Sequence, residues 1–499
     1  TQDPQVAVVA VVEEWAKEWR VDSVLQLQQR PWETCQVEPM EPITAEEVWK
    51  AGSRFKEHTG VGADLLHPKL FSTLSRPGAQ AVADLLNRVE AERQWPAHQQ
   101  MLIYFLILKP NGKDRPIGLL PSLIRLWETI RVPYMRKWLR ANPKEWDCCS
   151  PGQSSEGAVW ETLLAHEADG AAECGPNDKV SATVIMDLVK AFERVELVQV
   201  WHWGLEYGFP RALLAMVLTY FGYARRLVVD GRTSTQLQTY TAIVAGSRYS
   251  VCFLRMVLQW PMDSLLKNYP DLRLKVFVDD ASLQLRREQW RLALDLPSMV
   301  DTITEYLEEV GLNISKGEWF KPGGKSQVLV TTPWLRDRLQ VTFKRRGYFL
   351  VQSAVYLGVD VAPGRKAKQK RRERRANFNR RLGRALSLKR GGGKPVRKGV
   401  RKVLQNGLKP AFLYGAKCLG LNDSELQTLR RGLKKAGTSG RGSTTMQLAL
   451  AKLEPTMQVA AMPVRMWSSA LLDSPQNSVM MKDAWQQSRM FAATKPQPD

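Results

Sequence analysis

The sequence lacks the motifs that mark several common kinds of site. Only five histidines occur in 499 residues, and none lies in an HExxH pattern, which excludes a zinc protease of that type. The six cysteines show no CxxC spacing, so neither a zinc site nor a disulfide framework is indicated, and we expect a reducing intracellular compartment. No GxSxG or GxxxxGK[ST] motif is present, which argues against a nucleophile-elbow hydrolase or a P-loop NTPase.

Long apolar runs and an excess of acidic residues are also missing. Uncharged stretches such as Ala212–Ala224 fall well short of the roughly 18 residues of a membrane helix, so we expect no integral membrane protein. With 44% hydrophobic and 24% charged residues the composition is that of a globular chain. Lys and Arg number 72 against 50 Asp and Glu, a net charge of +22, which favours a polyanionic partner.

The positive charge is concentrated in one segment. Residues Arg365–Lys409 hold 19 basic side chains and one acidic one, Glu373, and therefore carry +18 of the net +22. Such a run would release counterions on binding RNA or DNA, with a steep salt dependence. A solvated or disordered arm and a nuclear localisation signal are the other two interpretations that this composition allows.

Two apolar runs end in aspartate. Leu274–Leu285 predicts a β-hairpin with Asp279 and Asp280 at its turn, and Ala182–Met186 predicts a buried strand that stops at Asp187. Aspartate is common in turns for local reasons, so a structural role is the alternative. If the two strands are neighbours, the three carboxylates form a cluster of hard oxygen ligands suited to two Mg²⁺ ions, with Mn²⁺ as a substitute.

The remaining pattern mixes strands and helices without regular alternation, which favours an α+β fold. A strand is expected at Met101–Leu108, and a hairpin at Leu227–Val229 with Asp230-Gly231 as its turn. Helices are expected at Ala45–Glu57, Gly78–Trp95, Leu119–Trp138, from Asp187 to Gly208, from Pro210 to Phe221, and at Ser250–Leu266. Thr44 is the expected N-cap of the first of these helices.

These residues resemble the reverse transcriptases, especially those of non-LTR (LINE-type) retrotransposons. Asp187–Val195 is similar to the first catalytic block of that family, and Phe277–Asp280 to the second. Seven further blocks follow the order of the family: Thr59–Asp64, Leu106–Lys109 with Arg115–Ile117, Gly152–Gly157, Gly246 with Ser250, Gly311–Lys316, Tyr356–Gly358 and Tyr414–Ala416.

The resemblance implies a role for each matching residue. Asp187, Asp279 and Asp280 would hold the metals. Phe192 would exclude a ribose 2′-hydroxyl, although such a residue is often simple core. The other implied nucleotide contacts are Lys109 and Arg115 at the triphosphate, Gly246 at the template, and Lys316 as a proton donor to pyrophosphate, where the alternative for each lysine or arginine is an ordinary solvated cation.

The implied architecture is a right-hand polymerase with a mixed palm sheet and a helical, basic thumb. It would have an N-terminal extension at 1–44, fingers at 45–180, a palm at 181–360, and a basic connector and thumb at 361–499. The primer grip would be Tyr356, Leu357 and Gly358, and the basic run would hold the RNA–DNA duplex through Arg371, Arg372, Arg374, Arg375, Arg380 and Arg381.

The implied partners are an RNA template, a DNA primer and deoxynucleoside triphosphates. No endonuclease or cysteine-rich signature accompanies the polymerase blocks, so we expect other domains of a larger element protein to act with them, or a solitary relative. Three departures stand out: Ala245 where the family carries Gln, Glu193 where it commonly carries Asp, and Val278 where it commonly carries Ala. An RNA-directed RNA polymerase and a non-catalytic RNA-binding protein on a retired polymerase fold are the alternative functions.

Overall fold

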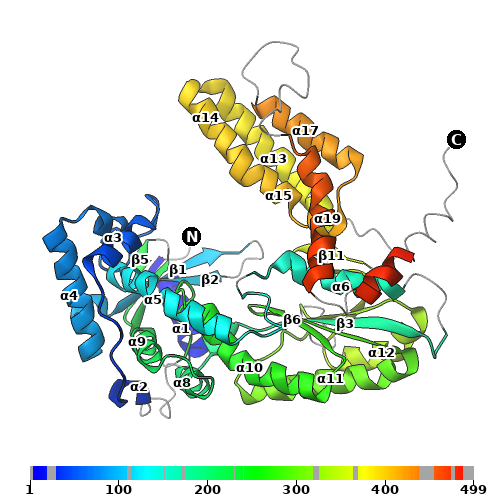
Figure 1. Cartoon of the computed structure of the whole chain (residues 1–499), viewed down its shortest axis with the longest axis horizontal. Coiled ribbons are helices and arrows are strands. Elements are labelled where there is room, and N and C mark those ends of the chain that lie inside the picture. Colours follow the sequence, from blue (N-terminus) through cyan, green and yellow to red (C-terminus); the bar gives the residue numbers. More distant parts are fainter. Residues whose placement is uncertain are drawn as a thin grey trace. The chain divides into compact units, whose positions relative to one another are not determined.

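The chain folds into two compact units, each assembled from three segments. The structure, a computed structural model, describes residues 4–19, 30–109, 114–150, 152–169, 175–229, 231–239, 241–317, 325–362, 369–437, 454–473 and 478–486 (Figure 1). Unit 1 comprises Thr1–Pro151, Leu188–Pro270 and Val300–Ile314, and unit 2 comprises Gly152–Asp187, Asp271–Met299 and Ser315–Asp499. The expected division into fingers, palm and thumb stays a prediction.

Unit 1 contains a four-stranded sheet in the order β2-β1-β4-β5. Strand β1, Met101–Leu108, coincides with the predicted strand, and it pairs antiparallel with β2 and parallel with β4. Val229 pairs with Arg232, which confirms the predicted hairpin, although Asp230 of its turn lies outside the described residues. The other strands are β2 (Asp114–Leu119), β4 (Ala224–Val229) and β5 (Arg232–Thr233).

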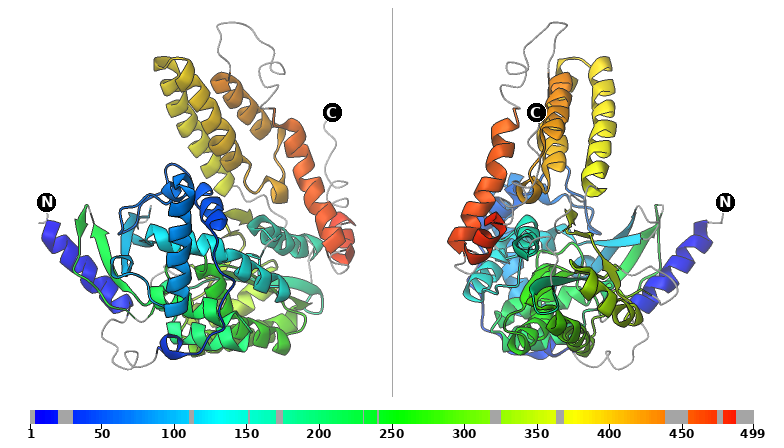
Figure 2. Two further views of the ribbon diagram at one scale, coloured as in Figure 1. Left: turned by 60° about the vertical axis from the view of Figure 1, so that its left-hand side comes forward. Right: turned by 90° about the vertical axis from the view of Figure 1, so that its right-hand side faces the viewer.

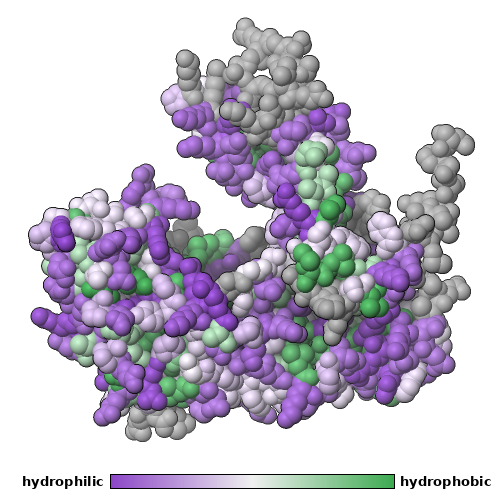
Figure 3. All heavy atoms as spheres, viewed as in Figure 1, coloured by the Kyte–Doolittle hydropathy of each residue, from purple (hydrophilic) through white to green (hydrophobic). Residues whose placement is uncertain are grey.

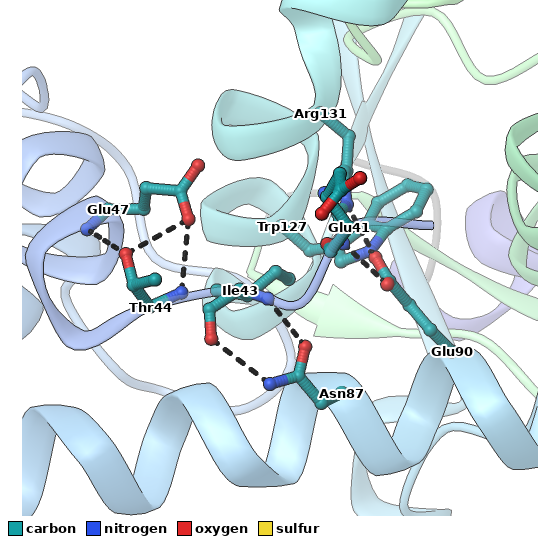
Figure 4. Close-up of polar contacts among 8 residues, drawn as sticks. All are labelled: Glu41, Ile43, Thr44, Glu47, Asn87, Glu90, Trp127 and Arg131. Atoms are coloured by element: carbon teal, nitrogen blue, oxygen red, sulfur yellow. Dashed lines mark hydrogen bonds and ion pairs between the residues drawn. The ribbon is translucent and has the colours of Figure 1, made fainter. Parts of the chain in front are cut away.

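Most helices of unit 1 lie close to their expected positions, but the helix expected from Asp187 to Gly208 is replaced by two shorter ones, α7 and α8. α3 begins after Thr44, which forms a full capping box with Glu47 (Figure 4). α4 begins two residues earlier than expected because Ser75 caps it, and α5 begins three residues later because Leu119 still pairs in β2. The helices are α1 (Pro4–Glu18), α2 (Pro31–Thr34), α3 (Ala45–Ser53), η2 (Pro68–Thr73), α4 (Arg76–Glu92), η3 (Ala97–Gln99), α5 (Ser122–Ala141), α7 (Ala191–Arg194), α8 (Leu197–Glu206), α9 (Arg211–Phe221), α10 (Ser250–Asn268) and the second half of α11 (Gln289–Glu309).

A buried ion pair joins α4 to α5. Both oxygens of Glu90 accept hydrogen bonds from Arg131 at 2.6 Å, and Oε1 also accepts one from Trp127 at 2.6 Å (Figure 4). Arg131 donates a further bond to the carbonyl oxygen of Glu41, at 2.8 Å. Because the charges are paired and hydrogen-bonded, their burial is tolerated, and the pair fixes how the two helices pack.

The N-terminal helix α1 packs against the sheet of unit 1 (Figure 2). The ring of Trp19 lies 5.1 Å from that of Tyr104, and the buried guanidinium of Arg225 lies about equally close to both rings. Thr239 and Thr241 donate hydrogen bonds to the carbonyl oxygen of Trp19. Residues ahead of the first polymerase-like block are therefore an integral part of this unit.

Unit 2 contains a five-stranded mixed sheet in the order β6-β7-β3-β8-β9. Helix α6 (Ser155–Asp169) covers one face, and α12 (Pro333–Arg345) with α11 lies on the other (Figure 1). Strand β3 is buried along almost its whole length, which explains why its sequence is a continuous apolar run. The strands are β3 (Lys179–Asp187), β6 (Arg273–Phe277), β7 (Asp280–Glu288), β8 (Gln327–Val330) and β9 (Phe349–Val351).

The C-terminal part of unit 2 follows a two-stranded hairpin and is helical. The basic run from residue 369 onward is helix rather than a disordered arm, while 365–368 lie outside the described residues. Its helices pack around a buried apolar cluster that includes Phe378, Leu404 and Leu433. The elements are β10 (Ala354–Tyr356), β11 (Val359–Val361), α13 (Gln369–Gly391), α14 (Lys394–Val403), the π-helix η4 (Leu404–Leu408), α15 (Lys409–Leu413), α16 (Ala416–Leu419), α17 (Asp423–Gly437), α19 (Thr456–Asp473) and a last helix at 478–486.

No helix within the described ranges combines the length and apolar character needed to cross a bilayer.

Candidate active site

The register of unit 2 brings the predicted aspartates together. β3 and β7 pair antiparallel, and Asp187, the last residue of β3, lies directly opposite Asp280, the first residue of β7. Asp279 immediately precedes Asp280. The expectation that both aspartates form the turn is wrong in one detail: Phe277 pairs with Asp280, so the two-residue turn is Val278-Asp279, and Val278 has a φ of +61°.

Crowding of negative charge is evident at Asp280. Burial, followed by the charges of Asp279 and Asp187, raises the pKa of the Asp280 carboxyl to about 7, and Lys325 opposes the shift. A carboxylate with this environment gains from a nearby cation because the cation relieves both the repulsion and the loss of hydration.

The backbone of Asp187 is held by hydrogen bonds, and its side chain by a lysine. Its amide donates to Ser326 Oγ at 3.3 Å, and its carbonyl oxygen accepts from the amide of Ser315 at 2.7 Å. Its carboxylate oxygens lie 2.7 and 2.8 Å from Lys325 Nζ. Within the described ranges no three His, Cys, Asp or Glu side chains form a ready metal-ligand group; at this site Asp187 is turned to Lys325 instead.

Unit 1 holds the residues expected at the nucleotide except Lys316, which lies in unit 2. Phe192, in α7, is half-buried, Lys109 is half-buried at the end of β1, and Arg115 is exposed on β2. Burial raises the pKa of Glu193, while Lys190, Lys109 and Arg225 lower it. Lys109 therefore lies within electrostatic reach of the residue that follows Phe192.

Gly246 occupies a position that only glycine fits. Its φ is +131°, and a Cβ there would lie 2.3 Å from the carbonyl oxygen of Gly118. The next residue, Ser247, donates to Glu128 Oε1 at 2.5 Å, and Tyr220 donates to the same oxygen at 2.8 Å. The segment after Gly246 thus folds around Glu128, a buried glutamate of α5 that sequence reasoning did not single out.

The predicted primer grip is the β10–β11 hairpin of unit 2. Tyr356 is buried and pairs with Val359, and its hydroxyl donates to the carbonyl oxygen of Lys275 at 3.4 Å. Leu357 and Gly358 form the turn, both with positive φ. The turn therefore lies within the same unit as the three aspartates.

The arginines predicted to bind nucleic acid divide into two groups on α13. Arg371 donates to the carbonyl oxygens of Leu419 and Gly420, and Arg374 donates to that of Gly358. Both lie on the side of the helix that packs inward. The exposed members are Arg372, Arg375, Arg380 and Arg381, of which Arg380 also donates to Asn377. Figure 3 shows hydrophilic residues over the visible face of α13, α14 and α17.

The lysine that contacts Asp187 is not the one singled out in the sequence. Lys316 is exposed, and its predicted role is untested. Lys325 lies just ahead of β8, which pairs with β3 on the side away from β7. The sequence signal for this contact was the run Lys325–Val330, an apolar strand preceded by a lysine. Such a strand can pair with Ala182–Asp187 and bring its lysine to Asp187.

Comparison with known proteins agrees with this arrangement. The family model described as "Reverse transcriptase (RNA-dependent DNA polymerase)" matches residues 107–321, a range that includes Asp187, Asp279 and Asp280. No curated protein matches the chain. The similarity to the reverse transcriptase family therefore covers residues 107–321, which include all three aspartates.

Proposed function

We propose that the chain is an RNA-directed DNA polymerase that extends a primer on an RNA template, and that it derives from a retrotransposon of the non-LTR type. The observation that carries the proposal is the pairing of Asp187 with Asp280 beside Asp279, at the ends of two buried strands. Two-metal phosphoryl transfer needs such a cluster of oxygen ligands, because the protein contributes mainly positioning and charge.

The three carboxylates fit divalent cations by their chemistry. They are hard oxygen donors, and the raised pKa of Asp280 reflects first its burial and then repulsion by Asp279 and Asp187, both of which a cation would offset. Asp187, Asp279 and Asp280 would hold the ions. When bound, Mg²⁺ or Mn²⁺ would lower the pKa of the primer 3′-hydroxyl and balance the charge of the leaving pyrophosphate.

The other residues would bind and orient the substrates. Lys109 and Arg115 would pair with phosphate oxygens of the incoming triphosphate, Phe192 would pack against its sugar, and Gly246 would support the template. Lys316 would be the proton donor to pyrophosphate. Tyr356, Leu357 and Gly358 would position the primer end, and the exposed arginines of α13 would contact the duplex backbone.

The decisive experiment is primer extension on an RNA template with Mg²⁺, in which deoxynucleotides and ribonucleotides are supplied in separate reactions. Wild type is expected to extend the primer with deoxynucleotides, and Asp279→Asn to lose at least about a hundredfold in rate, the order of effect seen when one key electrostatic group is removed. Asp178→Asn is the matched control. Asp178 precedes β3, at the end opposite Asp187, and accepts a hydrogen bond from Gly175, so its variant should keep full activity.

The remaining outcomes decide between the alternatives. Extension with ribonucleotides alone would favour an RNA-directed RNA polymerase. Tight RNA binding without extension under any of these conditions would favour a binding protein on a retired polymerase fold. Equal activity of wild type and Asp279→Asn would reject the assigned site.

A further inference from the structure

Lys325 reaches Asp187 as a consequence of strand register. Gln327 of β8 lies opposite Ile185 of β3 in an antiparallel pair. Asp187 lies two residues after Ile185, and Lys325 lies two residues before Gln327. Because the strands are antiparallel, this pairing brings Lys325 and Asp187 side by side. The hydrogen bond from the Asp187 amide to Ser326 Oγ holds this alignment past the end of the strand.

The contact uses the atoms that a metal would need. Lys325 Nζ lies 2.7 Å from one carboxylate oxygen of Asp187 and 2.8 Å from the other. An ammonium group and a divalent cation cannot both occupy this position, because their charges repel and the two oxygens are shared.

The two partners differ in their freedom to move. The Lys325 side chain is 64% exposed, whereas that of Asp187 is 17% exposed. A long, exposed lysine can swing into solvent with little loss, while the aspartate at the end of a buried strand stays in place.

We propose that Lys325 is an internal counter-ion that occupies Asp187 in the metal-free protein and is displaced when a divalent cation binds. The lysine thereby raises the metal concentration at which the site fills. This inference rests on the proposed function, since it takes the aspartates to be metal ligands. An exposed ion pair of this kind changes an equilibrium by about two- to fivefold.

The test measures Mn²⁺ binding to the full chain by the electron paramagnetic resonance signal of free Mn²⁺, without nucleic acid or nucleotide. Lys325→Gln should bind Mn²⁺ about two- to fivefold more tightly than wild type. The gain should shrink as KCl is added, because salt screens the exposed pair. An unchanged or weaker affinity of Lys325→Gln would overturn the proposal.

A matched control lies at the end of β3 opposite Asp187. Lys179 is exposed to a similar extent and faces Glu288 on β7 at 3.9 Å. Lys179→Gln makes the same change in net charge as Lys325→Gln. Because Lys179 lies at the far end of β3 from Asp187, this variant should leave Mn²⁺ affinity unchanged. Lys325→Arg keeps the charge and should bind Mn²⁺ no more tightly than wild type, and a clear gain in that variant would contradict the proposal.

Failure of this inference can be told from failure of the proposed function. If Asp279→Asn weakens Mn²⁺ binding but Lys325→Gln leaves it unaltered, only the counter-ion role is lost. If wild type shows no Mn²⁺ binding that depends on Asp279, the metal site and the proposal built on it both fail.

Discussion

Arg374 of α13 donates a hydrogen bond to the carbonyl oxygen of Gly358, in the turn between β10 and β11. The same guanidinium lies 5.1 Å from the centre of the Tyr414 ring, and the Tyr414 hydroxyl donates to the carbonyl oxygen of Leu357 at 2.8 Å. The turn predicted to hold the primer is therefore fixed by two side chains from the helical part of unit 2. The basic helix α13 and the turn are therefore held together by these contacts and form one structural element.

Removal of the Tyr414 hydroxyl should loosen this element. Tyr414→Phe keeps the ring beside Arg374 but loses the hydrogen bond to Leu357 and the 3.1 Å contact with Ser155 Oγ. We expect the free energy of unfolding to fall by about 1 kcal/mol. The KM for primer–template should rise with little change in kcat. Denaturant unfolding and steady-state extension measure the two effects.

The control for this variant is Tyr306→Phe, whose hydroxyl accepts a hydrogen bond from Asn268 at 2.8 Å in unit 1. It removes a comparable bond away from the turn and should leave the KM unchanged. A KM shift of equal size in both variants would show that the effect is not specific to the turn.

The two groups of arginines on α13 should differ in their effects on nucleic-acid binding and on stability. Replacing Arg372 and Arg375 together with Gln removes exposed charge only, so the slope of log K against log salt should flatten by up to about 1.8 for duplex binding. The melting temperature should stay within a few degrees of wild type. Salt titrations of binding and thermal melts check both statements.

The complementary pair, Arg371→Gln with Arg374→Gln, removes the bonds to Leu419, Gly420 and Gly358. We expect it to lower stability by about 2–4 kcal/mol, because the carbonyl oxygens lose charged donors. If this pair instead flattened the salt slope at unchanged stability, the division of the helix into inner and outer arginines would be wrong.

Local signals predicted much of the fold, and long-range pairing explains what they missed. The run Met101–Leu108 and the Thr44 cap are self-contained, and the structure reproduces both. Helix α6 was not predicted because it is buried nearly all round and so shows little periodicity. Helix α11 has Pro297 in its interior, which reads as a break in a sequence.

The residues of the candidate site also fall into those that local sequence signals predicted and those that only long-range pairing places. The approach of Asp187 to Asp280 could be anticipated because both end apolar runs. The contact of Lys325 with Asp187 was not anticipated: the apolar run after Lys325 marks a strand, but the contact also depends on which strand flanks β3 and in what register. The buried Glu128 was hidden for a related reason: its partners Ser247 and Tyr220 lie about a hundred residues away in the chain.

Gly246 offers a strong test of backbone geometry. Gly246→Ala places a methyl group against the carbonyl oxygen of Gly118 at a φ of +131°, so we expect a loss of at least about 3 kcal/mol in stability. Gly231→Ala is the control, since Gly231 also has positive φ but nothing lies within 4 Å of an added Cβ. It should cost only about 1 kcal/mol. Equal losses in the two variants would exclude the clash as the cause.

The buried His166 should control stability in acid. Its Nε2 lies 2.8 Å from Thr183 Oγ1, and burial lowers the pKa of its imidazole to about 3. Between pH 6.5 and 3 the unfolded chain binds a proton that the folded chain does not, so this residue makes stability fall as pH falls through that window. The contribution is at most about 1.4 kcal/mol per pH unit.

Urea unfolding of wild type and His166→Gln at several pH values between 7 and 4 isolates this contribution, because every other titrating group is common to both proteins. The variant is expected to be less stable at pH 7, since Gln fills the site imperfectly, but its stability should decline less steeply toward pH 4. His202→Gln, at an exposed histidine of α8, should follow the wild-type slope. Parallel curves for wild type and His166→Gln would mean that the imidazole accepts a proton in the folded chain, and that water or an unsuspected partner reaches its buried ring.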